Sequence, residues 1–216
     1  MTQANGAVDG RVARGNETRR LVLRRTVDIA SVEGLDALSL GRIATELKLS
    51  KSGVFALFGS KEELQLATVR AAALVYQEKV VRPALDVPPG TERLWRLCES
   101  WLTYSRERVF PGGCFFYGAL AEYDAREGAV HDALVRAQRS WVELVERCAE
   151  EARGLGELDA RCDVPQLAFE LIALLELANA QSVLLGGVEG YQRARAGIAA
   201  RLHGLVTRPE LAPRAG

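Results

Sequence analysis

Hydrophobic residues recur at three- and four-residue spacing along most of the chain, and the two-residue alternation of half-buried β-strands is not found. This pattern predicts an all-α protein. Residues 1–16, which are rich in Gly, Ala, Asn and Arg, and residues 208–216 are expected to be flexible tails. Between them we predict a short helix after Ser39 and further helices over residues 17–33, 51–58, 61–81, 91–109, 114–123, 129–153, 165–185 and 189–206.

Three serines mark helix starts in the N-terminal part of the chain. Ser39 and Ser50 each stand where a side-chain oxygen can cap the first turn of a short helix. Ser60 and Glu63 have the S-x-x-E spacing of a capping box, which opens a long helix ending before Pro83. The break before Ser50 is too short to separate two independent helices, so the two short helices are predicted to form a helix-turn-helix.

The predicted helix over residues 165–185 is apolar on nearly every side and therefore needs to be covered all round. Insertion into a membrane is disfavoured because Glu170, Glu176, Asn179 and Gln181 interrupt the apolar run. We expect one side to pack on the chain's own core and the other on a second subunit, as in a homodimer. The residues expected at the dimer interface are Leu171, Leu174, Leu175, Ala178, Ser182 and Leu185.

Composition adds one functional hint. The chain has 216 residues, 48% hydrophobic and 26% charged, which is typical of soluble globular proteins of one or two domains. Its 28 basic and 28 acidic residues cancel. The charge is uneven, however: residues 1–61 carry ten Lys and Arg against six Asp and Glu, a net of +4, and residues 62–216 carry a net of −4. This asymmetry favours an anionic partner for the N-terminal part.

Several classes of protein lack support in the sequence. The N-terminus has no apolar segment of signal-peptide length, so we expect a cytoplasmic protein. The four cysteines are far apart without a C-x-x-C pair, and we expect free, mostly buried thiols at Cys98, Cys114, Cys148 and Cys162. No motif indicates a cofactor, a metal site or an enzymatic acid–base constellation. We therefore expect a non-enzyme without cofactor or metal.

Residues 39–64, SLGRIATELKLSKSGVFALFGSKEEL, resemble the signature of TetR-type (tetracycline-repressor-like) transcriptional regulators. Ile43-Ala44, Ser50-Lys51, Phe58 and Ser60-Lys61-Glu62 all stand in the family's register. The resemblance implies a three-helix DNA-binding domain at residues 17–61. It also implies a linking helix and a helical ligand-binding and dimerisation domain at residues 62–207.

The resemblance places the second helix of the helix-turn-helix in the major groove, with its N-terminal residues at the base edges. Lys51 can donate to guanine or phosphate, and Lys61 at a helix start suits a phosphate. Arginines of the first helix would add contacts to the DNA backbone. The expected DNA-binding residues are Arg42, Ser50, Lys51, Ser52, Gly53, Phe55, Ala56 and Lys61.

The family also implies a mostly apolar effector cavity in the second domain. The candidate lining residues are Trp101, Tyr104, Phe116, Tyr123 and Trp141. The implied function is a repressor that a small hydrophobic effector releases from a palindromic operator. The implied partners are double-stranded DNA, a second copy of the chain and the effector, without a membrane.

Three departures from the family pattern affect this interpretation. Phe55 replaces the usual Tyr and so lacks a hydroxyl for phosphate, and Ala56-Leu57 replaces a common polar or aromatic pair, which leaves few side chains for base readout. Lys48 occupies a turn position often taken by Gly. Two other functions stay open at this stage. One is a thiol-based redox-sensing regulator that responds through Cys114, if the following helix start lowers the thiol pKa. The other is a helical enzyme whose N-terminal helices are only structural.

Overall fold

The computed structural model describes the backbone of residues 4–213 and the side chains from residue 13 onward, except residue 14. Most of the described chain is helical, and its sole β-type pairing is an isolated bridge between Leu158 and Val206. The predicted all-α class is therefore confirmed. The α-helices are α1 (Ala4–Glu33), α2 (Leu40–Glu46), α3 (Lys51–Phe58), α4 (Lys61–Tyr76), α5 (Arg82–Leu85), α6 (Thr91–Arg106), α7 (Phe115–Tyr123), α8 (Ala129–Gly154), α9 (Val164–Leu185) and α10 (Glu189–His203).

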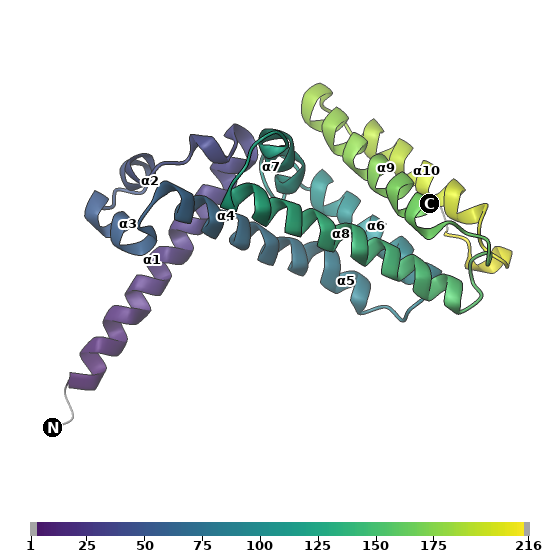
Figure 1. Cartoon of the computed structure of the whole chain (residues 1–216), viewed down its shortest axis with the longest axis horizontal. Coiled ribbons are helices and arrows are strands. Elements are labelled where there is room, and N and C mark those ends of the chain that lie inside the picture. Colours follow the sequence, from purple (N-terminus) through teal and green to yellow (C-terminus); the bar gives the residue numbers. More distant parts are fainter. Residues whose placement is uncertain (1–3, 214–216) are drawn as a thin grey trace.

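We call α1, α2, α3 and the short 3₁₀ turn η1 (Leu35–Ala37) the head, and the chain from α4 onward the body. The head lies at the left-hand end of the molecule in Figure 1, and α9 and α10 lie side by side at the opposite end. α7 occupies the junction, since it packs against both α1 and α8. The body therefore meets the head along α4 and α7.

The caps predicted from the sequence hold the head together. The hydroxyls of Ser39, Ser50 and Ser60 each accept a hydrogen bond from a backbone N–H of the following first turn, at 3.1 Å. Gly34, at φ 87°, ends α1 by taking the left-handed conformation that a side chain disfavours. The buried side chains of Ile43, Val54 and Phe58 then close the head's core.

Parts of both segments predicted to be tails are helical in the structure. α1 begins at Ala4 rather than at residue 17, because residues 4–16 contain no proline and continue the helical backbone. Residues 1–3 lie outside the described part. At the other end, Pro209–Leu211 form a 3₁₀ turn, η3, and residues 214–216 are not described.

The long helix after Ser60 continues through Pro83 instead of ending before it. A π-helical turn, η2 (Gln77–Val81), joins α4 to α5, and Pro83 lies in the first turn of α5. Proline lacks an N–H and its ring clashes with the carbonyl four residues earlier in a regular α-helix. The wider turn directly before Pro83 accommodates this ring, so α4, η2 and α5 form one continuous rod.

α9 has two faces with different surroundings. Leu171, Leu175, Ala178 and Ser182 are buried inside the chain itself, where α6, α8 and α10 cover them. These four residues were expected at a dimer interface, and that expectation is wrong. The periodicity of an all-apolar helix does not tell its inner side from its outer side.

Leu174 is half-buried, lies near Gly197 of α10 and belongs to the inner packing as well. Of the six expected interface residues, Leu185 is exposed. The exposed apolar stripe of α9, which we call its outer face, consists of Phe169, Ala173, Leu177 and Leu184. By length and composition α9 is also the one helix of the described chain that could cross a membrane, although 44% of that window is buried inside the fold.

Candidate nucleic-acid interface and ligand cavity

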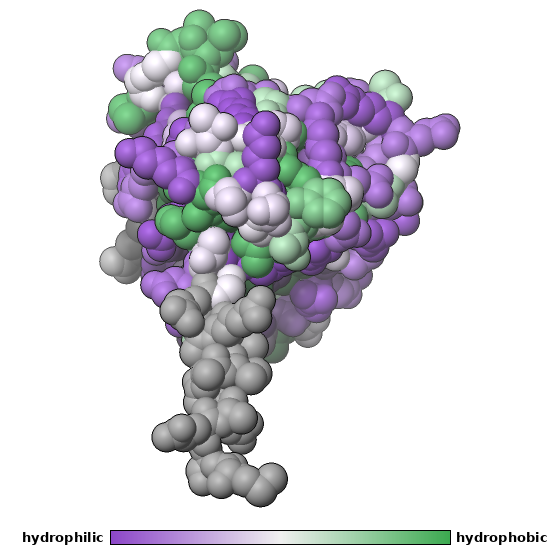
Figure 2. Space-filling view, turned by 90° about the vertical axis from the view of Figure 1, so that its left-hand side faces the viewer, coloured by the Kyte–Doolittle hydropathy of each residue, from purple (hydrophilic) through white to green (hydrophobic). Residues whose placement is uncertain are grey.

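The exposed side of α3 forms the tip of the head. Val54 and Phe58 point into the core, which leaves the side chains of Lys51, Ser52, Phe55 and Ala56, together with Gly53, on the solvent side. Figure 2 looks onto this end of the molecule and shows mostly hydrophilic side chains around smaller hydrophobic areas. Five of the eight expected DNA-binding residues thus share one accessible surface.

The three other expected DNA-binding residues already have intramolecular partners. The Arg42 guanidinium pairs with Glu33 at 2.7 Å and with Glu46 at 2.8 Å. The Lys61 ammonium donates to the backbone oxygen of Asp36 at 2.7 Å, and the Ser50 hydroxyl caps α3. Arg42 and Lys61 would exchange these partners on contacting phosphate, whereas Ser50 acts on the helix start.

The turn before α3 contains the strained position expected from the sequence. Lys48 has φ 55°, in the left-handed region that residues with a Cβ rarely occupy. A bond from the Leu49 N–H to the Ala44 carbonyl, 2.8 Å long, fixes the turn. The helix-turn-helix keeps its geometry without glycine here, at the cost of local backbone strain.

α7 and the loop that follows it hold the head through three residues, Glu122 and Tyr123 of the helix and Arg126 of the loop, which we call the α7 clamp. Glu122 accepts hydrogen bonds from the N–H groups of Leu35 at 2.7 Å and Asp36 at 2.8 Å. Arg126 pairs with the Asp36 carboxylate at 2.7 Å, and this bond, followed by the one from Lys61, holds the pKa of Asp36 below its usual range.

Tyr123 completes the clamp from inside. Its hydroxyl accepts a hydrogen bond from the buried Gln65 amide of α4 at 3.1 Å, and the same amide donates to the Leu35 carbonyl at 3.0 Å. The side chain of Tyr123 was expected to line the effector cavity. It lies instead at the contact between head and body and lines a second, more open hollow.

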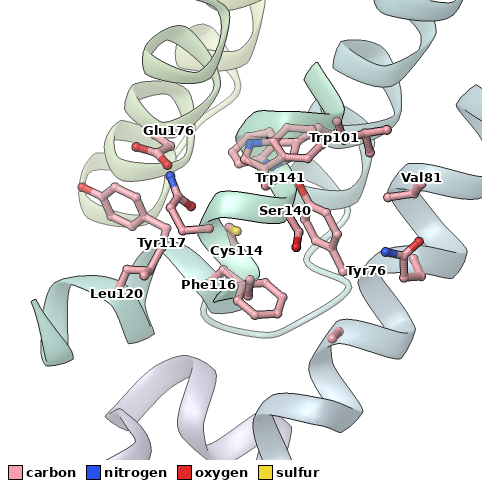
Figure 3. Close-up of a pocket in the computed structure, with 15 residues that line it drawn as sticks. Tyr76, Val81, Trp101, Cys114, Phe116, Tyr117, Leu120, Ser140, Trp141 and Glu176 are labelled. Carbon is pink, nitrogen blue, oxygen red and sulfur yellow. The ribbon is translucent and has the colours of Figure 1, made fainter. Parts of the chain in front are cut away.

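A cavity of about 240 Å³ lies in the body between α4, α6, α7, α8 and α9. This volume is slightly below the usual range of small-molecule sites, which span roughly 300–1,000 Å³. Figure 3 shows its labelled side chains, with Trp101 and Trp141 together on one side and Glu176 beside Tyr117 on another. The lining comprises Ala73, Tyr76, Gln77, Val81, Trp101, Cys114, Phe116, Tyr117, Leu120, Ala137, Gln138, Ser140, Trp141, Leu144 and Glu176.

Tyr76 organises the aromatic part of this wall. Its ring meets those of Phe116 and Trp141 nearly edge to face, with centroids 5.6 and 5.5 Å apart. It meets Tyr104 in the same way at 5.5 Å, but Tyr104 lies behind the wall in the core. Three of the five expected ligand residues, Trp101, Phe116 and Trp141, therefore line the cavity, whereas Tyr104 and Tyr123 do not.

Glu176 carries the one ionisable carboxyl group of the cavity lining. Burial raises its pKa, and a hydrogen bond from Gln138 partly offsets this rise. No ion pair of Glu176 is found within the described part of the chain. The sequence alone does not reveal this residue as part of a cavity, because a glutamate in an apolar helix indicates by itself only that the helix does not favour a membrane.

The thiols are buried and weakly acidic. Burial raises the pKa of Cys114 and of Cys148 to about 11 and that of Cys98 to about 12. The condition set for redox sensing at Cys114, a lowered pKa at the start of α7, is therefore not met. Cys114 instead lines the cavity as a small apolar group.

Two family models match the chain. The one described as bacterial regulatory proteins, tetR family, matches residues 22–68, and the one described as tetracyclin repressor-like, C-terminal domain, matches residues 90–198. The second match alone spans half of the chain. No curated protein sequence gives a significant match.

Solved structures of similar fold extend over nearly the whole chain. A TetR transcriptional regulator from Chloroflexus aurantiacus is 22% identical with a TM-score of 0.83, covering 90% of this chain and 98% of its own. A TetR-family regulator from Streptomyces coelicolor is 20% identical with a TM-score of 0.75, covering 95% and 96%. A putative transcriptional regulator from Saccharomonospora viridis, in complex with choline, is 23% identical with a TM-score of 0.70, covering 89% and 100%.

Proposed function

This chain belongs to the TetR family of bacterial regulatory proteins, and from that premise we propose that it is a homodimeric repressor released from a near-palindromic operator by a small molecule. The proposal divides the chain into a DNA-binding part, residues 17–61, and an effector and dimerisation part, residues 62–207. The observation that best supports this proposal is the double role of α7. It lines the cavity through Phe116, Tyr117 and Leu120, and it also binds the head.

Operator binding is assigned to the exposed side of α3. Lys51 is suited to reading guanine or holding phosphate, while Ser52, Gly53 and Ala56 permit a close approach to the base edges. Few of these side chains make specific hydrogen bonds, so readout through DNA shape supplements direct contacts. Arg42 and Lys61 supply phosphate contacts once they exchange their internal carboxylate partners.

Dimerisation is assigned to the outer face of α9. Phe169, Ala173, Leu177 and Leu184 lie along one side of the helix and are exposed in the single chain. Covering such an apolar stripe with its own copy is the simplest closed arrangement and places two heads on one operator. Residues of α10 beside it, such as the exposed Arg193, would form the polar rim.

The response to the effector is assigned to the helices that line the cavity and also contact the head. A molecule that fills the cavity contacts α4 and α7 together, and both helices are attached to the head. Release of DNA then requires that the effector bind more tightly to a head arrangement that does not fit two successive major grooves. The choline complex of the Saccharomonospora viridis relative supports small-molecule binding on this fold.

Selection of bound sequences from random DNA, at two salt concentrations, tests operator binding. We expect an inverted repeat, and we expect Lys51→Ala to weaken binding and reduce the salt slope by about one per subunit. The matched control is Lys79→Ala, on the exposed side of η2 far from α3. It should change neither the operator affinity nor its salt dependence. Failure of a folded dimer to enrich any sequence would overturn the repressor assignment.

A further inference from the structure

The cavity contains a negative charge without a positive partner. Glu176 of α9 reaches the cavity among aromatic rings, and neither Lys, Arg nor His belongs to the lining. Across the part of the chain that the structure describes, its carboxylate forms no ion pair, and the Gln138 amide is its neutral hydrogen-bond donor. Partial burial of an unpaired carboxylate is unfavourable, so the site gains stability when a cation enters it.

The rest of the lining fits the same kind of ligand. Tyr76, Trp101, Phe116, Tyr117 and Trp141 surround the cavity from α4, α6, α7 and α8. The face of an aromatic ring carries negative electrostatic potential, and several rings together attract organic cations such as quaternary ammonium groups. An anion would meet repulsion from both the rings and Glu176.

A second hollow offers a way in. It shares Tyr117, Leu120, Gln138 and Glu176 with the cavity and is more open to solvent. Its other ionisable lining groups include Asp124 and His131, and His131 lies 3.1 Å from the Asp132 carboxylate. The approach to Glu176 is therefore lined on balance by acidic groups, which raises the local concentration of cations.

We propose that the effector is a small organic cation, an alkyl- or arylammonium compound, with Glu176 as its counter-ion and the aromatic rings as its walls. This inference rests on the proposed function, because it names the ligand class for that same cavity. The cavity volume of about 240 Å³ limits the cation to a compact molecule, such as one ring with one ammonium group.

The test compares two probes of nearly equal shape, phenyltrimethylammonium and its neutral isostere tert-butylbenzene. Binding to the full-length protein is followed by tryptophan fluorescence, since Trp101 and Trp141 line the cavity. We expect the ammonium probe to bind at least about tenfold more tightly than the isostere.

Glu176→Gln should reduce affinity for the ammonium probe about tenfold or more and leave affinity for the isostere unchanged. The matched control is Glu143→Gln, an exposed change on α8 that should alter neither affinity. Thermal unfolding and operator binding of both variants establish that they are folded.

Equal or tighter binding of the isostere, or no detectable binding of the ammonium probe, would overturn the cation assignment. The same is true if Glu176→Gln leaves the ammonium affinity unchanged. None of these results touches the proposed function, which fails separately if the protein selects no operator or if no small molecule releases it.

Discussion

The carboxylate of Glu122, on the body, accepts a hydrogen bond from the backbone N–H of Leu35, on the head, at 2.7 Å. The two residues are far apart in the sequence, and a second bond to the neighbouring Asp36 N–H makes the contact bidentate. Leu120, two residues before Glu122, lines the cavity. Cavity and head thus meet within less than one turn of α7.

Removing the charge at Glu122 should loosen this connection. Glu122→Gln keeps one acceptor oxygen but loses a charge-assisted bond, so we expect the free energy of unfolding to fall by about 1–2 kcal/mol. Operator affinity without effector should change little, whereas the effector should release DNA less completely. Urea unfolding and operator titrations with and without effector measure both effects.

The control for Glu122 is Glu127→Gln, an exposed carboxylate in the loop that follows α7. It should leave stability and response unchanged. An intact effector response in a folded Glu122→Gln protein would show that α7 does not transmit the signal through this clamp.

Gly112 provides a second contact between body and head that tolerates no side chain. A Cβ added there would lie 1.7 Å from the Ser31 carbonyl oxygen of α1, and the Gly112 N–H donates to the Ser31 hydroxyl at 3.1 Å. We expect Gly112→Ala to push α1 from the body and destabilise the fold by about 3 kcal/mol.

Gly118 on α7 is the matched position, because nothing lies within 4 Å of a Cβ added there. Gly118→Ala should stabilise the protein by about 0.5–1 kcal/mol, since alanine restricts the unfolded chain and favours the helix. Thermal and urea unfolding of the two variants shows whether the loss of stability in Gly112→Ala comes from close packing at Gly112. If replacing any glycine destabilised the protein, Gly118→Ala would be destabilised as well.

If the dimer forms through the outer face of α9, a charge introduced into that face should weaken dimerisation. Leu177→Glu places a carboxylate in the apolar stripe, where the symmetric partner would bring a second one nearby, and we expect at least about a hundredfold weaker dimerisation. Leu155→Glu is the control, because Leu155 is equally exposed, at 58% against 56% for Leu177, but lies in the turn after α8. Sedimentation velocity over a concentration series distinguishes them; dimers of unchanged affinity in Leu177→Glu would place the interface elsewhere.

The thiol of Cys114 should react slowly below pH 10. With its pKa raised to about 11, its thiolate fraction at pH 8 is on the order of a hundredfold below that of an ordinary cysteine of pKa about 8.5, and it should rise about tenfold per pH unit. Native alkylation with iodoacetamide, read by mass spectrometry from pH 7 to 10, measures this.

A Cys114→Ser protein should respond to effector as the parent does. Two results together would support redox sensing through Cys114: alkylation of its thiol as fast as that of a free cysteine, and loss of the effector response in the Cys114→Ser protein. Cys162, whose pKa burial also raises, serves as an internal comparison in the same spectra.

The head could be predicted from sequence because its signals are local. Ser39, Ser50 and Ser60 act on the turn directly after them, and Lys48 takes the positive φ that its turn position requires. The start of α1 and the passage through Pro83 could not be predicted in this way. They depend on the continuity of the backbone and on a wide turn without a sequence signature of its own.

The body was harder to predict because the direction in which its side chains point depends on tertiary packing. α9 is apolar all round, so whether Leu171 or Leu177 faces the partner depends on where α8 and α10 lie. Tyr104 and Trp101 share a helix and similar spacing, yet Trp101 reaches the cavity and Tyr104 does not. Tyr76 and Glu176 were not predicted as ligand residues, because they come together from helices a hundred positions apart.

The π-helical turn between α4 and α5 places about one extra residue in the continuous helical segment that joins head and cavity. Gln77 and Val81 line the cavity from within this turn, whereas Lys61 begins the same rod at the head. Each residue of an α-helix advances the direction of its side chain by about 100°. A π-helical turn holds about one residue more than an α-helical turn, so a one-residue deletion that restored regular α-helix would keep the phase beyond the turn nearly unchanged but would re-aim the side chains within the turn, among them Gln77 and Val81. The length of this segment is therefore as constrained as its composition, and homologues that keep this cavity should keep the extra residue.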